Sequence, residues 1–300
     1  MEKITFAGQL LQYLITGLTV GSIYAMVAVG FNIIYNVTEI INFAQGEFVM
    51  LGGLVMVFCH ATIGLPLVLA FPVTVIVVTL VGMLLDRLAI NPIRQPTVLT
   101  LIIATIAASV LIKGTAMFIW GKDPYDLPAF SGRNPLIVMG AVVQPQYLWV
   151  IGFLILIVIA LKFFFDRTIL GKAMSACADN PDAASLVGID VKLMILLSFA
   201  LSAAIGAVAG ITITPISLME YDRGAMLAVK GFGAVVLGGL GSFPGAVVGG
   251  LILGVIESMG AGLISSGYKD AFALVVLVIV LFYKPSGIFG NIEISRIKRF

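Results

Sequence analysis

The polar motif INFAQGEF, residues 41–48, interrupts two long apolar blocks. Its amide, glycine and carboxylate members are Asn42, Gln45, Gly46 and Glu47. A carboxylate near membrane depth is costly and usually faces a cavity, a pathway or a partner. Glu39 and Glu47 are eight positions apart, so an unbroken helix would place them near the same face. The motif therefore predicts a functional site, with a simple interfacial hairpin between two spans as the alternative.

A second polar stretch, GKAMSACADNPDAASLVGID at residues 171–190, has the signals of a short helix outside the apolar blocks. Asn180 can cap the helix, and Pro181 suits its first position. Asp182 favours the positive end of the helix dipole, and Gly188 can end the helix in the left-handed conformation. We predict a helix of about seven residues and about 10 Å. It suits insertion into a groove on another protein, although an ordinary loop helix is the alternative. Its candidate apolar contacts are Leu186 and Val187.

Glycines recur every four residues within residues 230–258. The two series are Gly241, Gly245 and Gly249, and Gly250 with Gly254. This spacing places glycine on one side of a helix and lets backbones approach closely. Pro244 marks the start of that helix, and Lys230 and Glu257 are isolated charges that bound the segment. We predict packing between helices of this chain, with a subunit interface or gate as the alternative.

No arrangement of side chains predicts catalysis or metal binding. His60 is the single histidine and lies in an apolar run near a predicted span end, so we interpret it as an interfacial residue. Cys59 and Cys177 lack the spacing of a metal or redox motif and are interpreted as packing residues. A Ser-His-Asp set, a metal-ligand cluster and a phosphate loop are all missing from the sequence. We expect no catalytic residue, no metal site and no cofactor bound by this chain.

The composition indicates a membrane protein. Hydrophobic residues make up 60% of the chain and charged residues 11%, where a soluble domain has about 25% charged residues. Residues 4–38 and 193–219 carry no charge, and a bilayer crossing needs roughly 20 such residues. The net charge of +2, without a run of Lys or Arg, argues against a nucleic-acid partner and leaves membrane lipid as the surroundings.

The predicted fold is all-α, a polytopic transmembrane helical bundle of about 8–9 crossings, some of them broken or re-entrant. We expect one domain over residues 1–300, with an external loop at residues 121–146 and a cytoplasmic segment at residues 167–191. The seventh and ninth crossings are short. The predicted crossings are residues 8–35, 40–60, 65–86, 97–120, 147–166, 192–217, 226–240, 244–264 and 269–284.

The distribution of Lys and Arg favours a cytoplasmic C-terminus, because loops on that side are enriched in these residues. With nine crossings and the N-terminus outside, the cytoplasmic side receives Arg87, Arg94, Lys162, Arg167, Lys172, Lys192, Lys284, Arg296, Lys298 and Arg299.

Several long motifs, in this order, resemble the LivH-type permeases of branched-chain amino-acid ABC importers, from about residue 9 to residue 290. They are GLTVGSIYAMVAVGFNIIY followed by INFAQGE, then GKAMSACADNPDAASLVGI, AVVLGGLGSFPGAVVGGLILGVIE and YKDAFALVVLVIVLFYKPSGIFG. One position departs from the pattern, because many relatives carry His where this chain has Gln45. A glutamine keeps the hydrogen bonding of that position but cannot titrate near neutral pH.

The resemblance implies a multi-pass permease subunit of the bacterial inner membrane that moves branched-chain amino acids into the cytoplasm. It implies four partners: a LivM-like permease subunit, two cytoplasmic ATPase subunits that bind ATP and Mg, and a periplasmic amino-acid-binding protein. It places the INFAQGE motif, with Asn42, Gln45, Gly46 and Glu47, on the translocation pathway. It assigns coupling to an ATPase to Gly171, Ala178, Asp179, Asn180, Ala183, Leu186, Gly188 and Ile189.

Three other functions remain open at this stage. ABC permeases for urea or short amides resemble the same motifs, so the motifs do not settle the substrate. An ion-coupled carrier or a self-sufficient channel would move its substrate without ATPases. An intramembrane enzyme would require a catalytic constellation that the sequence lacks.

Overall fold

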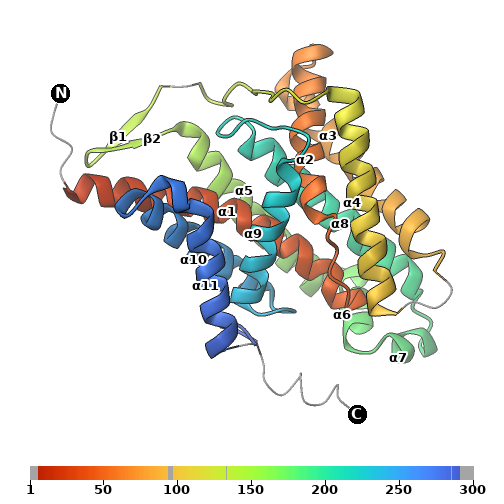
Figure 1. Ribbon diagram of the computed structural model, residues 1–300. Coiled ribbons are helices and arrows are strands. Elements are labelled where there is room, and N and C mark those ends of the chain that lie inside the picture. Colours follow the sequence, from red (N-terminus) through yellow and green to blue (C-terminus); the bar gives the residue numbers. More distant parts are fainter. Residues whose placement is uncertain (1–5, 94–96, 133, 285, 291–300) are drawn as a thin grey trace.

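The computed structural model describes residues 6–93, 97–132, 134–284 and 286–290, which form a bundle of α-helices (Figure 1). The helices of these ranges are α1 (Phe6–Thr38), α2 (Gln45–Val57), α3 (Leu67–Leu85), α4 (Val98–Trp120), α5 (Pro145–Arg167), α6 (Ile169–Asp179), α7 (Pro181–Leu186), α8 (Val191–Ile213), α9 (Arg223–Gly238), α10 (Phe243–Leu263) and α11 (Lys269–Tyr283). Helices α2 and α3 continue into π-helical turns at Phe58–Thr62 and Asp86–Ile90, and a 3-10 turn at Ser266–Tyr268 precedes α11. Strands β1 (Leu136–Val138) and β2 (Ala141–Val143) pair as an antiparallel hairpin within the predicted external loop.

Eight helical segments in the described part of the chain are long and apolar enough to cross a bilayer. They confirm the predicted polytopic helical bundle. The predicted seventh crossing corresponds to α9, whose 16 residues extend only about 24 Å, less than the roughly 30 Å of a hydrocarbon core. The non-helical link between α8 and α9 supplies the remaining path, and its members Thr214 and Met219 are fully buried. Irregular backbone at this depth is tolerated because protein surrounds it.

The link between α8 and α9 is tied to the long loop that follows α4. Tyr125 and Met219 exchange two backbone hydrogen bonds, of 2.8 and 2.9 Å between nitrogen and oxygen. This contact fixes the start of α9 near the same end of the bundle as the loop. Helix α9 then runs toward the other end, where Phe243 at the start of α10 packs against Phe165 of α5.

The chain from Glu39 to Glu47 is not an unbroken helix, so the condition for the two carboxylates to share one face is not met. Helix α1 ends at Thr38, and Glu39 has a φ of 57°, a left-handed conformation that stops the helix. Helix α2 begins only at Gln45. The break turns the chain back into the bundle, so the two carboxylates belong to different elements.

The two ends of the bundle are distinct (Figure 1). The β1–β2 hairpin contacts the start of α1, where Gln12 accepts a hydrogen bond from the Val142 backbone, and α6 and α7 lie at the opposite end. The chain order brings the ends of α3, α5 and α11 and the start of α8 to the α6–α7 end. Of the basic residues expected at that side, Arg94, Arg296, Lys298 and Arg299 lie outside the described residues.

Helix α2 is the centre of the bundle, because all of its residues are buried. Helices α1, α8 and α9 pack around it, while α3, α4, α5 and α11 place apolar side chains on the outside. Only 11% of the residues in the apolar 18-residue stretch of α4 or of α5 are buried inside the protein. An apolar outer face with a close-packed interior is the arrangement expected of a protein whose surroundings are lipid tails.

Candidate functional site

The α6–α7 segment is built by consecutive caps. The Thr168 hydroxyl accepts a hydrogen bond from the Gly171 backbone at 2.9 Å and starts α6. Asn180 ends α6 and starts α7, with its Oδ1 accepting from the Ala183 backbone at 2.9 Å. Gly188 has a φ of 88° and ends the helical turn, and Asp190 caps α8. The predicted short helix with Asn180 and Gly188 at its ends is confirmed, at six residues.

One side of the α6–α7 segment packs on the bundle and the other is exposed. Met174, Cys177 and Ala184 are buried, and a Cβ on Gly171 would lie 2.2 Å from the Phe164 carbonyl oxygen. Burial raises the pKa of the Cys177 thiol. The exposed or half-buried members include Ala178, Asp179, Asn180, Ala183, Leu186, Gly188 and Ile189. Leu186 and Val187 are 89% and 78% exposed, so this segment presents two adjacent apolar side chains on a rigid turn.

The INFAQGE motif lies deep in the bundle, at the junction of α1 and α2. Gln45 is fully buried, donates to the Ser202 carbonyl at 3.3 Å and accepts from the Ser202 hydroxyl at 2.5 Å. The same hydroxyl lies 2.8 Å from the Gly30 carbonyl oxygen, so its single hydrogen is shared between two acceptors. These bonds join α1, α2 and α8 at one point. They use the hydrogen-bonding capacity of the amide and require no titratable group.

Asn42 and Glu47 are buried with part of their hydrogen-bonding capacity unused. Asn42 Oδ1 accepts from the Ala44 backbone at 3.1 Å, and Glu47 Oε1 accepts from the Ser109 hydroxyl at 2.9 Å. Asn42 Nδ2 and Glu47 Oε2 have no hydrogen-bond partner among the described residues. Unpaired buried polar atoms are rare because they carry a desolvation cost. Both unpaired atoms lie at the junction of α1 and α2.

Gly46 brings α2 against α9 at the same junction. A Cβ on Gly46 would lie 2.0 Å from the Gly224 carbonyl oxygen, and one on Gly224 would lie 2.5 Å from Glu47 Oε2. Only glycine allows this approach, so the start of α9 sits directly over the Glu47 carboxylate.

The glycines of α10 pack against two different helices. Cβ atoms on Gly245 and Gly249 would meet the backbone of α9, at 2.4 Å from the Gly238 oxygen and 2.2 Å from the Ala234 oxygen. Cβ atoms on Gly250 and Gly254 would meet the backbone of α1. Gly241 lies outside the helix, in the turn before α10, because the helix starts at Phe243 under the Ser242 cap. Glycine thus lies on two faces of α10, where the repeat had suggested one.

Opposite charges meet where α9, α10 and α11 converge. We call Lys230, Glu257, Lys269 and Asp270, with the Tyr24 hydroxyl, the charge cluster. Lys230 Nζ lies 2.9 Å from Glu257 Oε1 and 2.6 Å from Asp270 Oδ1, and Lys269 Nζ lies 3.4 Å from Glu257 Oε1. The Tyr24 hydroxyl lies 3.0 and 2.9 Å from the two Glu257 oxygens. Buried charges in membrane proteins are expected to pair in this way.

The charge cluster was missed by sequence reasoning, which took Lys230 and Glu257 as isolated charges. The signal was present, because a single Lys and a single Glu in neighbouring apolar spans are each too costly to bury alone. What the sequence does not provide is the crossing geometry that brings the two side chains together.

The remaining candidate residues have structural partners. His60 Nδ1 lies 2.8 Å from the Leu65 carbonyl, where the chain turns between α2 and α3. Cys59 and Cys177 are buried free thiols, as predicted for packing residues. No group of three or more His, Cys, Asp or Glu side chains in the described ranges is arranged to hold a metal ion.

Comparison with known proteins matches residues 13–281 to the family described as "Branched-chain amino acid transport system / permease component". The chain is 33% identical to the high-affinity branched-chain amino acid transport system permease protein BraD of Pseudomonas aeruginosa, over 96% of this chain and 98% of BraD. It is 32% identical to LivH of Escherichia coli K12, over 96% and 97%. It is 28% identical to a probable LivH of Methanocaldococcus jannaschii, over 93% and 91%. With a family match over most of its length and relatives of this identity, the chain belongs to the family of permease components of branched-chain amino acid transport systems.

Proposed function

We propose that this chain is the membrane-spanning permease subunit of an ATP-driven importer for branched-chain amino acids in the bacterial inner membrane. Its similarity to BraD and LivH over 96% of the chain carries the proposal. The helical bundle agrees with it, because eight segments can cross a bilayer. In this role the chain makes and breaks no chemical bond itself.

The proposed importer needs partner subunits. A LivM-like permease subunit pairs with this chain, a periplasmic binding protein delivers the amino acid, and two cytoplasmic ATPase subunits bind ATP and Mg. The outer helices support this assembly, because α3, α4, α5 and α11 leave wide apolar faces uncovered, which a second membrane subunit and lipid together can cover.

The α6–α7 segment is the proposed coupling element. Its turn holds Leu186 and Val187 outward while Met174, Cys177 and Ala184 anchor the opposite side to the bundle. A groove on an ATPase can take up the exposed pair. Because α6 follows α5 directly and α7 leads into α8, movement of the segment is transmitted to two spanning helices. The ATPases then bias the bundle between two states through contacts that differ in each state.

The INFAQGE junction is proposed to lie on the pathway. In the present state Asn42, Gln45, Gly46 and Glu47 are buried, so the amino acid reaches them only after α9 moves from its contact with α2. Two polar atoms at this junction without partners, Asn42 Nδ2 and Glu47 Oε2, support the proposal, since a zwitterion in transit can bond both.

Reconstitution in liposomes tests the function. The tagged chain is purified from native membrane with the proteins that accompany it, the binding protein is added outside the liposomes, and uptake of labelled leucine is measured with and without internal ATP. ATP-dependent leucine uptake by a complex that contains ATPases supports the proposal. Uptake of urea or short amides in place of leucine would change the substrate, and ion-driven uptake by this chain alone would contradict the importer.

A surface variant tests the coupling element separately. Leu186→Ser with Val187→Ser is expected to abolish co-purification of the ATPases without changing the yield of folded chain, because both side chains are exposed. Leu186→Met with Val187→Ile keeps the apolar surface and serves as the matched control. Full ATPase retention in the serine variant would exclude these residues as the contact.

A further inference from the structure

Two members of the charge cluster reach the surface of the bundle. The Lys269 and Asp270 side chains are 47% and 55% exposed, and they begin the helical part of a candidate span, Ser266–Tyr283. Charged groups within spans normally face a partner or a water-filled cavity, because lipid tails exclude them. The surface around Lys269 is therefore unsuited to lipid tails and suited to a polar solute.

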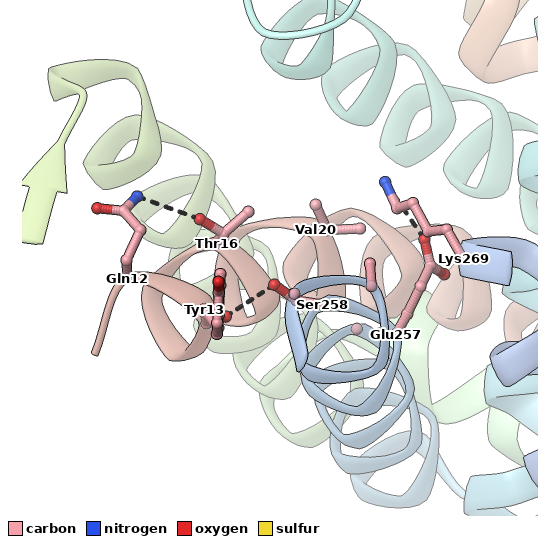
Figure 2. A pocket seen from close by; sticks show the side chains of 10 residues that line it. Gln12, Tyr13, Thr16, Val20, Glu257, Ser258 and Lys269 are labelled. Atoms are coloured by element: carbon pink, nitrogen blue, oxygen red, sulfur yellow. Dashed lines mark hydrogen bonds and ion pairs between the residues drawn. The ribbon is translucent and has the colours of Figure 1, made fainter. Parts of the chain in front are cut away.

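A hollow of about 310 Å³ lies beside Lys269, between the first half of α1 and the end of α10 (Figure 2). Figure 2 shows the Glu257–Lys269 ion pair at one end of the hollow and the Gln12–Thr16 hydrogen bond at the other. Its size is at the lower limit of the roughly 300–1,000 Å³ found for small-molecule sites. The hollow therefore suits a small ligand.

The charged end of the hollow can receive a negative group. A Lys ammonium has three donors, and Lys269 Nζ makes an ion pair of 3.4 Å with Glu257 Oε1. That oxygen is bound more closely by Lys230, at 2.9 Å, so Lys269 is the more weakly held of the two ammonium groups. A ligand carboxylate can pair with Lys269, whereas Glu257 is fully buried and both of its oxygens are already in contact with the Tyr24 hydroxyl.

The wall between the two ends suits an aliphatic side chain. Val20 of α1 and Ala261 of α10 line it, together with Tyr13. The hollow thus combines a paired charge at one end with an apolar wall.

We propose that this hollow is a transit site for an aliphatic amino acid, with its carboxylate on Lys269 and its side chain along Val20 and Ala261. The inference rests on the proposed import of branched-chain amino acids and assigns a binding site for them that is separate from the INFAQGE junction.

Protection of an introduced cysteine tests the site directly. Both native cysteines are buried, so Thr16→Cys supplies a thiol within the hollow. The variant is placed in the complete transporter in lipid nanodiscs, after its ATP-dependent leucine uptake has been verified, and maleimide labelling is followed with and without leucine. Leucine is expected to slow the labelling several-fold. Thr62→Cys, an exposed position of the π-helical turn after α2, is the control and should label at an unchanged rate. Val20→Cys replaces Thr16→Cys if the latter does not assemble.

Lys269→Gln and Lys269→Arg identify the charged contact. In the Thr16→Cys background, Lys269→Gln should raise the leucine concentration that gives half-protection about tenfold or more, whereas Lys269→Arg should change it less than about threefold. A transporter that imports leucine but shows no protection would overturn the site and leave the proposed function standing. Protection by anionic phospholipid and none by leucine would also overturn it. If the wild-type complex imports no branched-chain amino acid, the function and the site both fail.

Discussion

The α6–α7 segment and the charge cluster are stabilised in opposite ways. The segment is defined by neighbours in the chain, since each of its caps joins residues three positions apart. The charge cluster joins residues that are far apart, with Tyr24 and Glu257 separated by 233 positions. The segment presents apolar side chains outside the spans, whereas the cluster holds charges among them. In these two regions, charged side chains lie among the apolar spans and apolar side chains lie exposed outside them.

Because the two regions are stabilised differently, substitutions in them should have different effects on stability. Loss of a local cap loosens the few residues that the cap orders. Loss of one buried charge leaves its partners uncompensated and affects every helix that they join. Substitutions and labelling can test that distinction. Their expected effects range from a loss of global stability to a difference in thiol reactivity that leaves stability unchanged.

The largest effect is expected from Glu257→Gln. Lys230 loses the buried carboxylate 2.9 Å from its ammonium but keeps the half-exposed Asp270 at 2.6 Å, so the cost should lie at the lower end of the range for a broken buried ion pair, about 3 kcal/mol. We expect the free energy of unfolding of the purified chain in mixed micelles to fall by that amount, measured by titration with a denaturing detergent.

Two variants control the Glu257 prediction. Glu257→Gln with Lys230→Met removes both charges and should recover part of the loss. Glu220→Gln removes the surface pair with Arg223 and should cost less than about 1 kcal/mol. Equal stability of Glu257→Gln and Glu220→Gln would show that the charge cluster does not hold the helices together.

A smaller but still global effect is expected from Gly254→Ala. The added Cβ would lie 2.3 Å from the Gly21 backbone, so α1 and α10 must separate, at a cost of about 1–3 kcal/mol. The matched control is Gly152→Ala in α5, where a Cβ meets nothing within 4 Å. That control should be neutral or stabilise by up to about 1 kcal/mol. Thermal unfolding of the two variants in the same detergent measures the difference.

The same contrast explains what could be predicted from the sequence. Asn180 and Gly188 predict the ends of a helix by capping rules that involve only neighbouring residues. The all-α bundle is predicted by the composition and by the length of the apolar segments. The turn at Glu39 was not predicted, because a glutamate does not require a left-handed backbone conformation. The pairing of Lys230 with Glu257, and the division of the α10 glycines between α1 and α9, depend on how helices cross. The angles at which helices cross one another are set by the packing of the whole bundle, so the sequence of a single span does not predict them.

Asn180→Ala should act locally. The substitution removes the hydrogen bond from the Ala183 backbone to Oδ1, at a cost of about 1 kcal/mol to α7 alone. We expect faster amide hydrogen exchange in Pro181–Leu186 and no change in the unfolding of the bundle. Asn180→Asp keeps a capping oxygen and should restore the exchange rate. A matching loss of global stability in Asn180→Ala would contradict the local character of the segment. Under the proposed function, the alanine variant should also lower substrate-stimulated ATP hydrolysis.

The smallest perturbation uses Cys177, which needs no substitution. Its thiol is buried against the bundle, and burial raises its pKa, so less of the reactive thiolate is present at neutral pH. We expect maleimide to label Cys177 much more slowly than Leu186→Cys, whose side chain is exposed, and the rate at Cys177 to rise as the pH is raised toward its pKa. Denaturation should remove the difference. Because both thiols lie within one short segment, equal labelling of the folded protein would show that the segment is not anchored on its inner side. An unanchored segment could not move two spanning helices, so this measurement also tests the coupling step of the proposed function.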